Sequence, residues 1–272
     1  MFSSTTRSLA AAAGLAMATA SLAACTPSSS AHGLAVVATT TQICDYVTQI
    51  AAHSADISLD KTDAAGKSSH VGAQNDGAAL TMSLTCLLAP NASAHEHEMT
   101  PAQTSALAQA DVMAVSGVDL EHFLDDAVVS SGFKGRMVVT SGVLTAADID
   151  NPGTPDPEGA YTIDRGSERV DVAPWPFPPE EADEEPEFRF DPHVWTSPKG
   201  ARVQVANLGA GLAAAAPDAA SSINAATASY LEDIDALDQW TAEAIETVPE
   251  GQRVLFTSHD AFGYFSRDYG IR

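Results

Sequence analysis

The fold is decided by the stretch Leu34-Ala35-Val36-Val37-Ala38-Thr39-Thr40, an apolar run that turns polar at its end. An apolar run without alternation is typical of a strand that is buried on both faces of a parallel sheet. Residues 41–52 follow directly and place Ile43, Val47 and Ile50 at helical spacing. A buried strand that runs at once into a helix is the first half of a βαβ unit.

The same alternation continues toward the C-terminus. Strands are predicted at 57–59, 79–88, 112–115, 137–140 and 253–257, and helices at 101–110, 120–129, 201–215, 219–248 and 261–269. Strands that alternate with helices predict an α/β fold with a parallel sheet. Residues 60–77, rich in Gly, Ser, Asp and Asn, interrupt the pattern and are expected to be a surface insertion.

A second interruption, residues 146–188, is rich in proline and acid and poor in periodic structure. It ends in an acidic loop, 171–188, that contains Glu180-Glu181-Ala182-Asp183-Glu184-Glu185. A run of like charges usually forms a solvated surface loop. Because the run ends shortly before His193, weak capture of cations is the alternative interpretation.

Composition limits the classes of partner. The 272 residues carry 13 Lys+Arg against 36 Asp+Glu, a net charge of -23, and 45% of them are hydrophobic. This balance indicates a globular protein with an acidic surface. It argues against nucleic acid and against electrostatic docking on anionic lipid, and it is compatible with attraction of cations.

Residues 1–25 are typical of an export signal. Arg7 precedes the short apolar run 10–20, which is too short to span a membrane. Leu22-Ala23-Ala24-Cys25 resembles a bacterial lipobox, which predicts a lipid on Cys25 and an exported protein anchored on the outer face of the cytoplasmic membrane. Residues 26–33 would be its polar tether. A plain signal peptide with an incidental Cys25 is the alternative.

Two further cysteines, Cys44 and Cys86, complete the three in the chain. An even pair in an exported protein favours a disulfide, with two buried free thiols as the alternative. A metal role is less favoured, because neither cysteine lies in a short Cys/His cluster.

A cluster of imidazoles and carboxylates lies in Ser93-Ala94-His95-Glu96-His97-Glu98-Met99-Thr100-Pro101. Thr100 suits an N-cap, Pro101 the first helical position, and Gln103 completes a capping box. The cluster therefore lies on a loop between a strand and a helix, where ligands bind in open α/β sheets.

Two more histidines, His193 and His259, occupy the same architectural position, beside predicted strand ends. Imidazole is a ligand suited to zinc and other first-row metals. Each of the three histidines also has a neighbouring carboxylate: Glu96, Asp191 and Asp260. We interpret His95, His193 and His259 as candidate metal ligands.

Four motifs together resemble the metal-binding lipoproteins of zinc and manganese ABC importers. Residues 36–43 look like the family's first strand and helix. Residues 95–101 look like its Pro-His-x-Tyr-Glu-x-Thr-Pro motif, with Ala94 for Pro and His97 for Tyr. Asp191-Pro192-His193-Val194-Trp195-Thr196-Ser197-Pro198 and Thr257-Ser258-His259-Asp260-Ala261-Phe262-Gly263-Tyr264-Phe265 match its second and third ligand motifs.

The resemblance implies two parallel-sheet α/β lobes joined by one long rigid helix, 219–248, with an N-terminal lobe at 34–218. Residues 252–272 would begin the C-terminal lobe, which we expect to be truncated in this chain. His95 and His193 would come from the first lobe and His259 from the second. The family's fourth ligand, a carboxylate, would lie beyond Arg272, which leaves an open coordination position.

The resemblance further implies a monomeric, non-enzymatic receptor that captures a divalent metal and delivers it to an ABC transporter permease. Three nitrogen ligands favour Zn²⁺, and Mn²⁺ is the alternative. His97 would support the ligand histidines from behind or capture the metal transiently, Glu98 would orient the loop, and Asp260 would support its neighbour. A surface adhesin or structural lipoprotein with incidental histidines remains an alternative. A zinc hydrolase is another, although the chain has no His-Glu-x-x-His motif.

Overall fold

The computed structural model describes residues 1, 33–74, 77–156, 159–177 and 188–272. Residues Gly33–Arg272 form one compact unit, which is described below. The predictions for the signal peptide, for Cys25, for the tether up to residue 32 and for the acidic run 180–185 concern residues outside this set.

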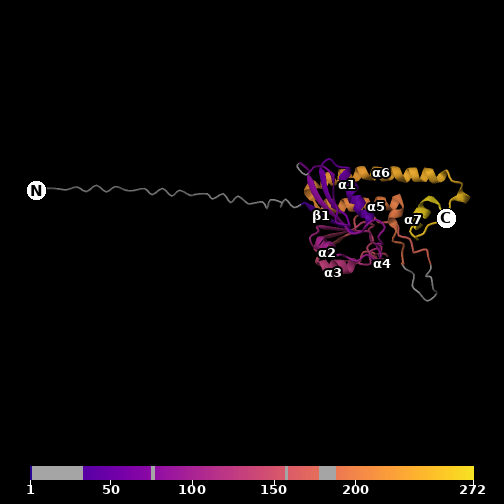
Figure 1. Ribbon diagram of the computed structural model, residues 1–272, viewed down its shortest axis with the longest axis horizontal. Coiled ribbons are helices and arrows are strands. Elements are labelled where there is room, and N and C mark those ends of the chain that lie inside the picture. The colour runs from indigo at the N-terminus through magenta and orange to yellow at the C-terminus, as the bar shows by residue number, and fades with distance from the viewer. Residues whose placement is uncertain (2–32, 75–76, 157–158, 178–187) are drawn as a thin grey trace. The chain divides into compact units, whose positions relative to one another are not determined.

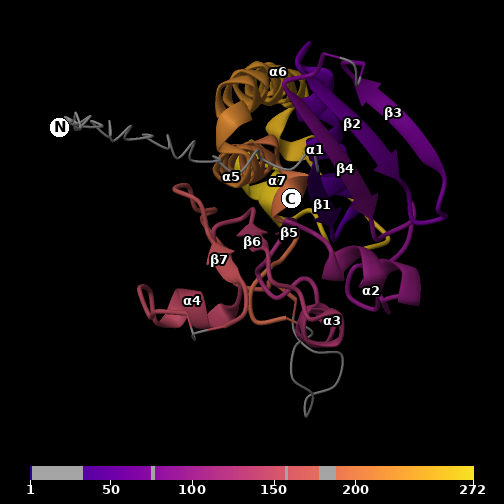
Figure 2. The same cartoon turned by 90° about the vertical axis from the view of Figure 1, so that its left-hand side faces the viewer.

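A seven-stranded sheet with the order β3-β2-β4-β1-β5-β6-β7 forms the centre of the unit (Figure 2). Neighbouring strands are parallel except β2 and β3, which are antiparallel. The predicted α/β fold with a largely parallel sheet is therefore confirmed. The strands are β1 (Leu34–Ala38), β2 (Ile57–Thr62), β3 (Ser68–Gly72), β4 (Leu80–Cys86), β5 (Val112–Val115), β6 (Arg136–Val139) and β7 (Thr162–Asp164).

Helices cover both faces of this sheet. One face carries α1, α5 and α6, and the other carries α2 and α3 (Figures 1 and 2). Within the described part of the chain, no helix is both long and apolar enough to cross a bilayer. The helices are α1 (Thr41–Ala52), α2 (Pro101–Ala108), α3 (Leu124–Ser131), α4 (Ala146–Asp150), α5 (Pro198–Ala215), α6 (Ala220–Glu246) and α7 (Gly263–Tyr269), with short 3₁₀ turns η1 (Val194–Thr196), η2 (Pro217–Ala219) and η3 (Glu250–Gln252).

Strand β1 shows why its sequence is apolar without alternation. Val36 and Ala38 belong to the core beneath α1, α5 and α6, whereas Val37 belongs to the core beneath α2 and α3. Successive side chains of a strand point to opposite faces. A strand that is covered on both faces therefore has no side chain facing solvent, and all of its positions favour apolar residues.

The order of the strands also locates the site. Strand β1 lies between β4 and β5, so the chain leaves β1 toward one edge and later returns past it to build the other. Helices α1 and α2, which follow β1 and β4, lie on opposite faces. Such a reversal opens a crevice at the carboxyl ends of the strands, where ligands bind.

The two interruptions contain more regular structure than predicted. Residues 60–77 include the end of β2 and all of β3, which pair as a hairpin with Asp60 opposite His70. Asp63 and Gly66 mark the turn, where Asp63 accepts hydrogen bonds from the backbone N–H groups of Ala65 and Lys67. Residues 146–188 contain α4 and the edge strand β7.

The prediction of a buried strand at 253–257 is wrong. These residues form no strand, and Phe256 is 92% exposed. Their backbone does exchange hydrogen bonds with Arg272, which donates to the Arg253 carbonyl at 2.9 Å and accepts from Leu255 at 2.8 Å. An apolar run becomes a buried strand only where further strands and helices cover it. The helix predicted at 120–129 also begins later, at Leu124.

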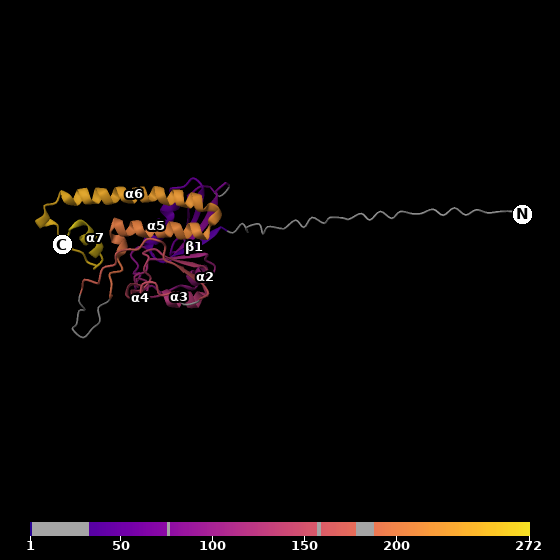
Figure 3. The same ribbon diagram turned by 180° about the vertical axis from the view of Figure 1, so that it is seen from behind.

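Two side-chain links hold α1 in place. A disulfide joins Cys44 of α1 to Cys86 at the end of β4, with a Cα–Cα distance of 5.6 Å, which is the predicted pairing. At the other end of α1, His53 contacts the Gln49 carbonyl at 2.8 Å and the Asp233 carboxylate of α6 at 3.0 Å. The Gln49 carbonyl and the Asp233 carboxylate raise the pKa of His53. From behind, α6 is seen to run past the sheet toward α7 (Figure 3).

Candidate metal site

His95 lies on the loop between β4 and α2, and Gln103 holds both ends of that loop. The predicted capping box is present: Thr100 Oγ1 accepts from the Gln103 N–H at 3.3 Å, and Gln103 Oε1 accepts from the Thr100 N–H at 2.9 Å. The Gln103 amide also donates to the Leu87 carbonyl at 2.7 Å. The loop that carries His95 is thus closed by one buried side chain.

His193 lies directly before η1 and is 1% exposed. Its backbone N–H and its ring Nδ1 both contact Oδ1 of the buried Asp191, at 3.0 and 2.8 Å. A carboxylate on Nδ1 selects the tautomer with its proton on Nδ1 and leaves Nε2 as the lone-pair nitrogen. His193 is therefore oriented as a ligand through Nε2.

His259 is exposed and lies on the loop before α7. The docking of α7 determines where this loop lies, because the buried Tyr264 hydroxyl donates to the Asp191 carbonyl at 2.7 Å and accepts from the Ala173 N–H at 3.1 Å. Gly263 approaches so closely that an added Cβ would lie 2.5 Å from Oδ2 of Asp191. Asp191 thereby connects the positions of His193 and His259.

The three histidines converge. One nitrogen from each of His95, His193 and His259 lies within 4.8 Å of the other two, and the Nε2 atoms of His193 and His259 are 3.2 Å apart. Ring centroids are separated by 5.6 Å for His95–His193, 6.3 Å for His95–His259 and 5.1 Å for His193–His259. Three imidazole nitrogens in so small a volume can bind a first-row divalent cation.

Aromatic side chains surround this cluster. The Phe188 ring lies 4.9 Å from His95, and Trp175 and Trp195 lie 5.9 and 5.5 Å from His193, all between ring centroids. A hydrophobic shell limits the access of water and strengthens the interaction between a cation and its ligands.

The supporting residues predicted from sequence, His97, Glu98 and Asp260, do not belong to the three-histidine cluster that the described residues form. The His97 ring packs edge-on against Phe123 at 4.9 Å, its Nε2 has no hydrogen-bond partner in the described structure, and burial lowers its pKa. Glu98 and Asp260 are exposed. Their supporting roles stay predictions.

Sequence reasoning missed His122. Its ring centroid lies 6.1 Å from that of His95, a separation similar to those within the three-histidine cluster. The signal that could have found it is its place on the loop after β5, because the carboxyl ends of neighbouring parallel strands meet at one edge.

Three converging imidazoles beside an open α/β sheet form the kind of site that metal-binding proteins of the α/β class use. The sequence model of the family described as "Zinc-uptake complex component A periplasmic" (ZnuA) matches residues 77–272. The chain belongs to this family.

Individual relatives agree with that assignment. Manganese-binding lipoprotein MntA of Bacillus subtilis (strain 168) is 29% identical over 189 residues, which cover 70% of this chain and 51% of the relative. Zinc-binding protein AdcA of Streptococcus pyogenes is 38% identical over 82 residues, covering 30% of this chain and 16% of the relative. The chain spans about half the length of MntA and of YfeA, the iron-binding protein of Yersinia pestis.

Solved structures share the fold. Zn(II)-bound AdcA from Streptococcus pneumoniae superposes with a TM-score of 0.58 at 20% identity, covering 89% of this chain and 38% of that one. The periplasmic zinc-binding protein TroA from Treponema pallidum gives a TM-score of 0.54 at 23% identity, covering 88% of this chain and 65% of that one.

Proposed function

We propose that this protein is an extracytoplasmic receptor that captures a divalent transition metal and delivers it to an ABC importer. The observation that carries the proposal is the convergence of His95, His193 and His259 within 4.8 Å, with His193 oriented by a buried carboxylate. Relatives named for binding manganese and zinc support the same class of cargo.

Zinc is the favoured cargo. Its borderline character suits imidazole, whereas manganese prefers sites with more oxygen ligands. The relatives include both manganese- and zinc-binding proteins, so their names do not select the metal. The choice of zinc rests on the three nitrogen donors.

The larger architecture forms part of the proposal. Residues 34–218 would be the N-terminal lobe, α6 the linking helix, and residues from 252 onward the beginning of a second lobe. Export, lipid attachment at Cys25, a monomeric state and delivery to a permease complete the proposed role.

The test is a metal titration of the full-length protein. Zinc is expected to bind at one equivalent and to raise the thermal midpoint, and its affinity should fall as the pH is lowered, because protons compete with zinc for the ligand nitrogens. Variants His95→Ala, His193→Ala and His259→Ala should each lose zinc. His70→Ala, on the exposed hairpin, is the matched control. Wild-type protein with no zinc-dependent stabilisation, or a zinc affinity unchanged in all three variants, would contradict the proposal.

A further inference from the structure

We propose that His122 is an outer ligand that, together with His95, takes up the incoming cation and passes it to His193 and His259. This inference rests on the proposed metal-capture function. It adds a transit position to the site, with His95 shared between the outer pair and the resident set.

The ring geometry supports a shared His95. His122 lies 6.1 Å from His95, within the range of 5.1 to 6.3 Å spanned by the resident rings. Among the described residues, however, the convergent set contains His95, His193 and His259 and does not extend to His122. His122 can therefore join His95 around a cation only before that cation reaches the other two histidines.

The exposure of the rings gives the order of events. His122 and His259 are exposed, His95 is half-buried and His193 is buried. A cation that enters on the side of the outer pair therefore meets His122 before it meets His95 and His193. The Phe188 ring lies beside all three imidazoles and lines the same route. Its centroid is 5.7 Å from that of His122, 4.9 Å from that of His95 and 6.2 Å from that of His193.

The loop of His122 is held firmly by its neighbour, Glu121. This buried carboxylate accepts from the Thr39 hydroxyl at 2.7 Å, from the Ser116 N–H at 2.6 Å and from the Gly117 N–H at 3.1 Å. Between Gly117 and Glu121 the backbone of Val118 has a positive φ of 58°, a conformation that is strained for a β-branched residue. Strain of this kind persists only where the surroundings impose it, as at ligand-binding loops.

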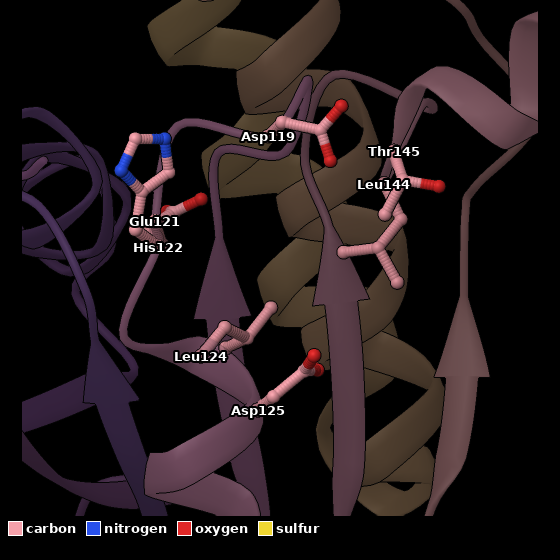
Figure 4. Close-up of a pocket in the computed structure, with 7 residues that line it drawn as sticks. All are labelled: Asp119, Glu121, His122, Leu124, Asp125, Leu144 and Thr145. Atoms are coloured by element: carbon pink, nitrogen blue, oxygen red, sulfur yellow. The ribbon is translucent and has the colours of Figure 1, made fainter.

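The pocket beside His122 favours cations. It has a volume of about 170 Å³ and is lined by Asp119, Glu121, His122, Leu124, Asp125, Leu144 and Thr145. In Figure 4 the Asp119 carboxylate and the His122 ring both lie beyond the strand arrowheads, whereas Asp125, a residue of α3, lies level with the strands. Both oxygens of Glu121 accept hydrogen bonds, whereas Asp119 accepts one bond, from the Ala146 N–H at 2.7 Å. Asp119 and Asp125 therefore supply the more accessible negative charge, which raises the local cation concentration.

A ligand used only in transit has a distinctive kinetic effect. It lowers the barrier to entry and to exit equally, so its removal slows association and dissociation together and leaves Kd unchanged. A resident ligand acts differently, because its loss mainly accelerates dissociation.

The experiment is stopped-flow zinc binding to the full-length protein, followed by the fluorescence of Trp175 and Trp195, which lie beside His193. His122→Ala is expected to reduce both rate constants by about tenfold and to keep Kd within about twofold. The visible spectrum of bound Co²⁺ should be the same in wild type and variant, because the resident ligands are intact. His70→Ala is the matched control for loss of an exposed histidine.

The outcomes separate the hypotheses. Unchanged rate constants in His122→Ala overturn the transit role, and a weakened Kd with an altered Co²⁺ spectrum overturns it in favour of a resident ligand. Failure of the wild type to bind zinc would instead refute the proposed function. Circular dichroism of His122→Ala distinguishes a local effect from misfolding, and His122→Gln, which keeps polarity without an imidazole, repeats the test in a milder form.

Discussion

Replacement of Asp191 by Asn should weaken zinc binding without removing any metal ligand. Both bonds to Oδ1 come from His193, one from its backbone and one from its ring. Asn keeps an acceptor oxygen and nearly the same volume, but it removes the negative charge. The ring Nδ1–H then donates to a neutral amide, which makes Nε2 a poorer electron donor and holds the ring less firmly.

The expected size follows from the burial of this pair. Asp191 and His193 are 2% and 1% exposed, so water cannot replace the lost charge. Loss of a residue that orients a metal-binding histidine costs about 10–100-fold in affinity, or roughly 1.4–2.7 kcal/mol. Two charge-assisted bonds that become neutral also cost the metal-free fold about 1–2 kcal/mol.

The assay is competition for zinc against a chromophoric chelator, with urea unfolding of the metal-free protein measured in parallel. Asp164→Asn is the matched control, because Asp164 forms a partly buried ion pair with Arg136 of the neighbouring strand. A folded Asp191→Asn protein that binds zinc within about twofold of wild type would refute the assigned role of the carboxylate.

Gly263→Ala should disturb the Asp191 carboxylate as well, because Gly263 of α7 packs directly against it. The new Cβ would lie 2.5 Å from Asp191 Oδ2, so the carboxylate or α7 must move. Either movement disturbs the relation of His193 to His259, and zinc affinity should fall as in Asp191→Asn. An affinity equal to wild type would show that α7 relaxes without disturbing the histidines.

Two predictions concern stability away from the site. Replacing Cys44 and Cys86 by Ala opens a link across 42 residues and should cost about 4 kcal/mol in urea unfolding; a loss below about 1 kcal/mol would contradict it. His53→Gln should remove stability that is present below the ordinary pKa of 6.5 and disappears as pH rises through the raised folded-state pKa. Because Asp233 is exposed, the difference from wild type should stay below about 1 kcal/mol at about pH 5.5 and shrink as the pH rises through the raised pKa; a difference that does not change with pH would refute it.

Much of the fold could be predicted because its signals are local. The apolar run of β1, the spacing of α1 and the capping box before α2 each lie within a dozen residues. The wrongly predicted strand has a physical origin: whether a segment is buried depends on the elements that pack against it, and these are distant in the sequence. Residues 253–257 carry the composition of a buried strand, yet burial depends on what packs against them, and Phe256 remains exposed.

The difference between local signals and tertiary contacts also explains which parts of the site could be predicted. Asp191 lies two residues from His193, so their partnership is a matter of local geometry that a motif can carry. The clamp on the His122 loop joins Glu121 to Thr39 across 82 residues, and no short pattern contains both. The bonds that orient His193 are thus local to it, whereas His95 and His122 are brought together by the order of the strands. His122 is therefore the kind of residue that the structure adds to the three histidines found from sequence.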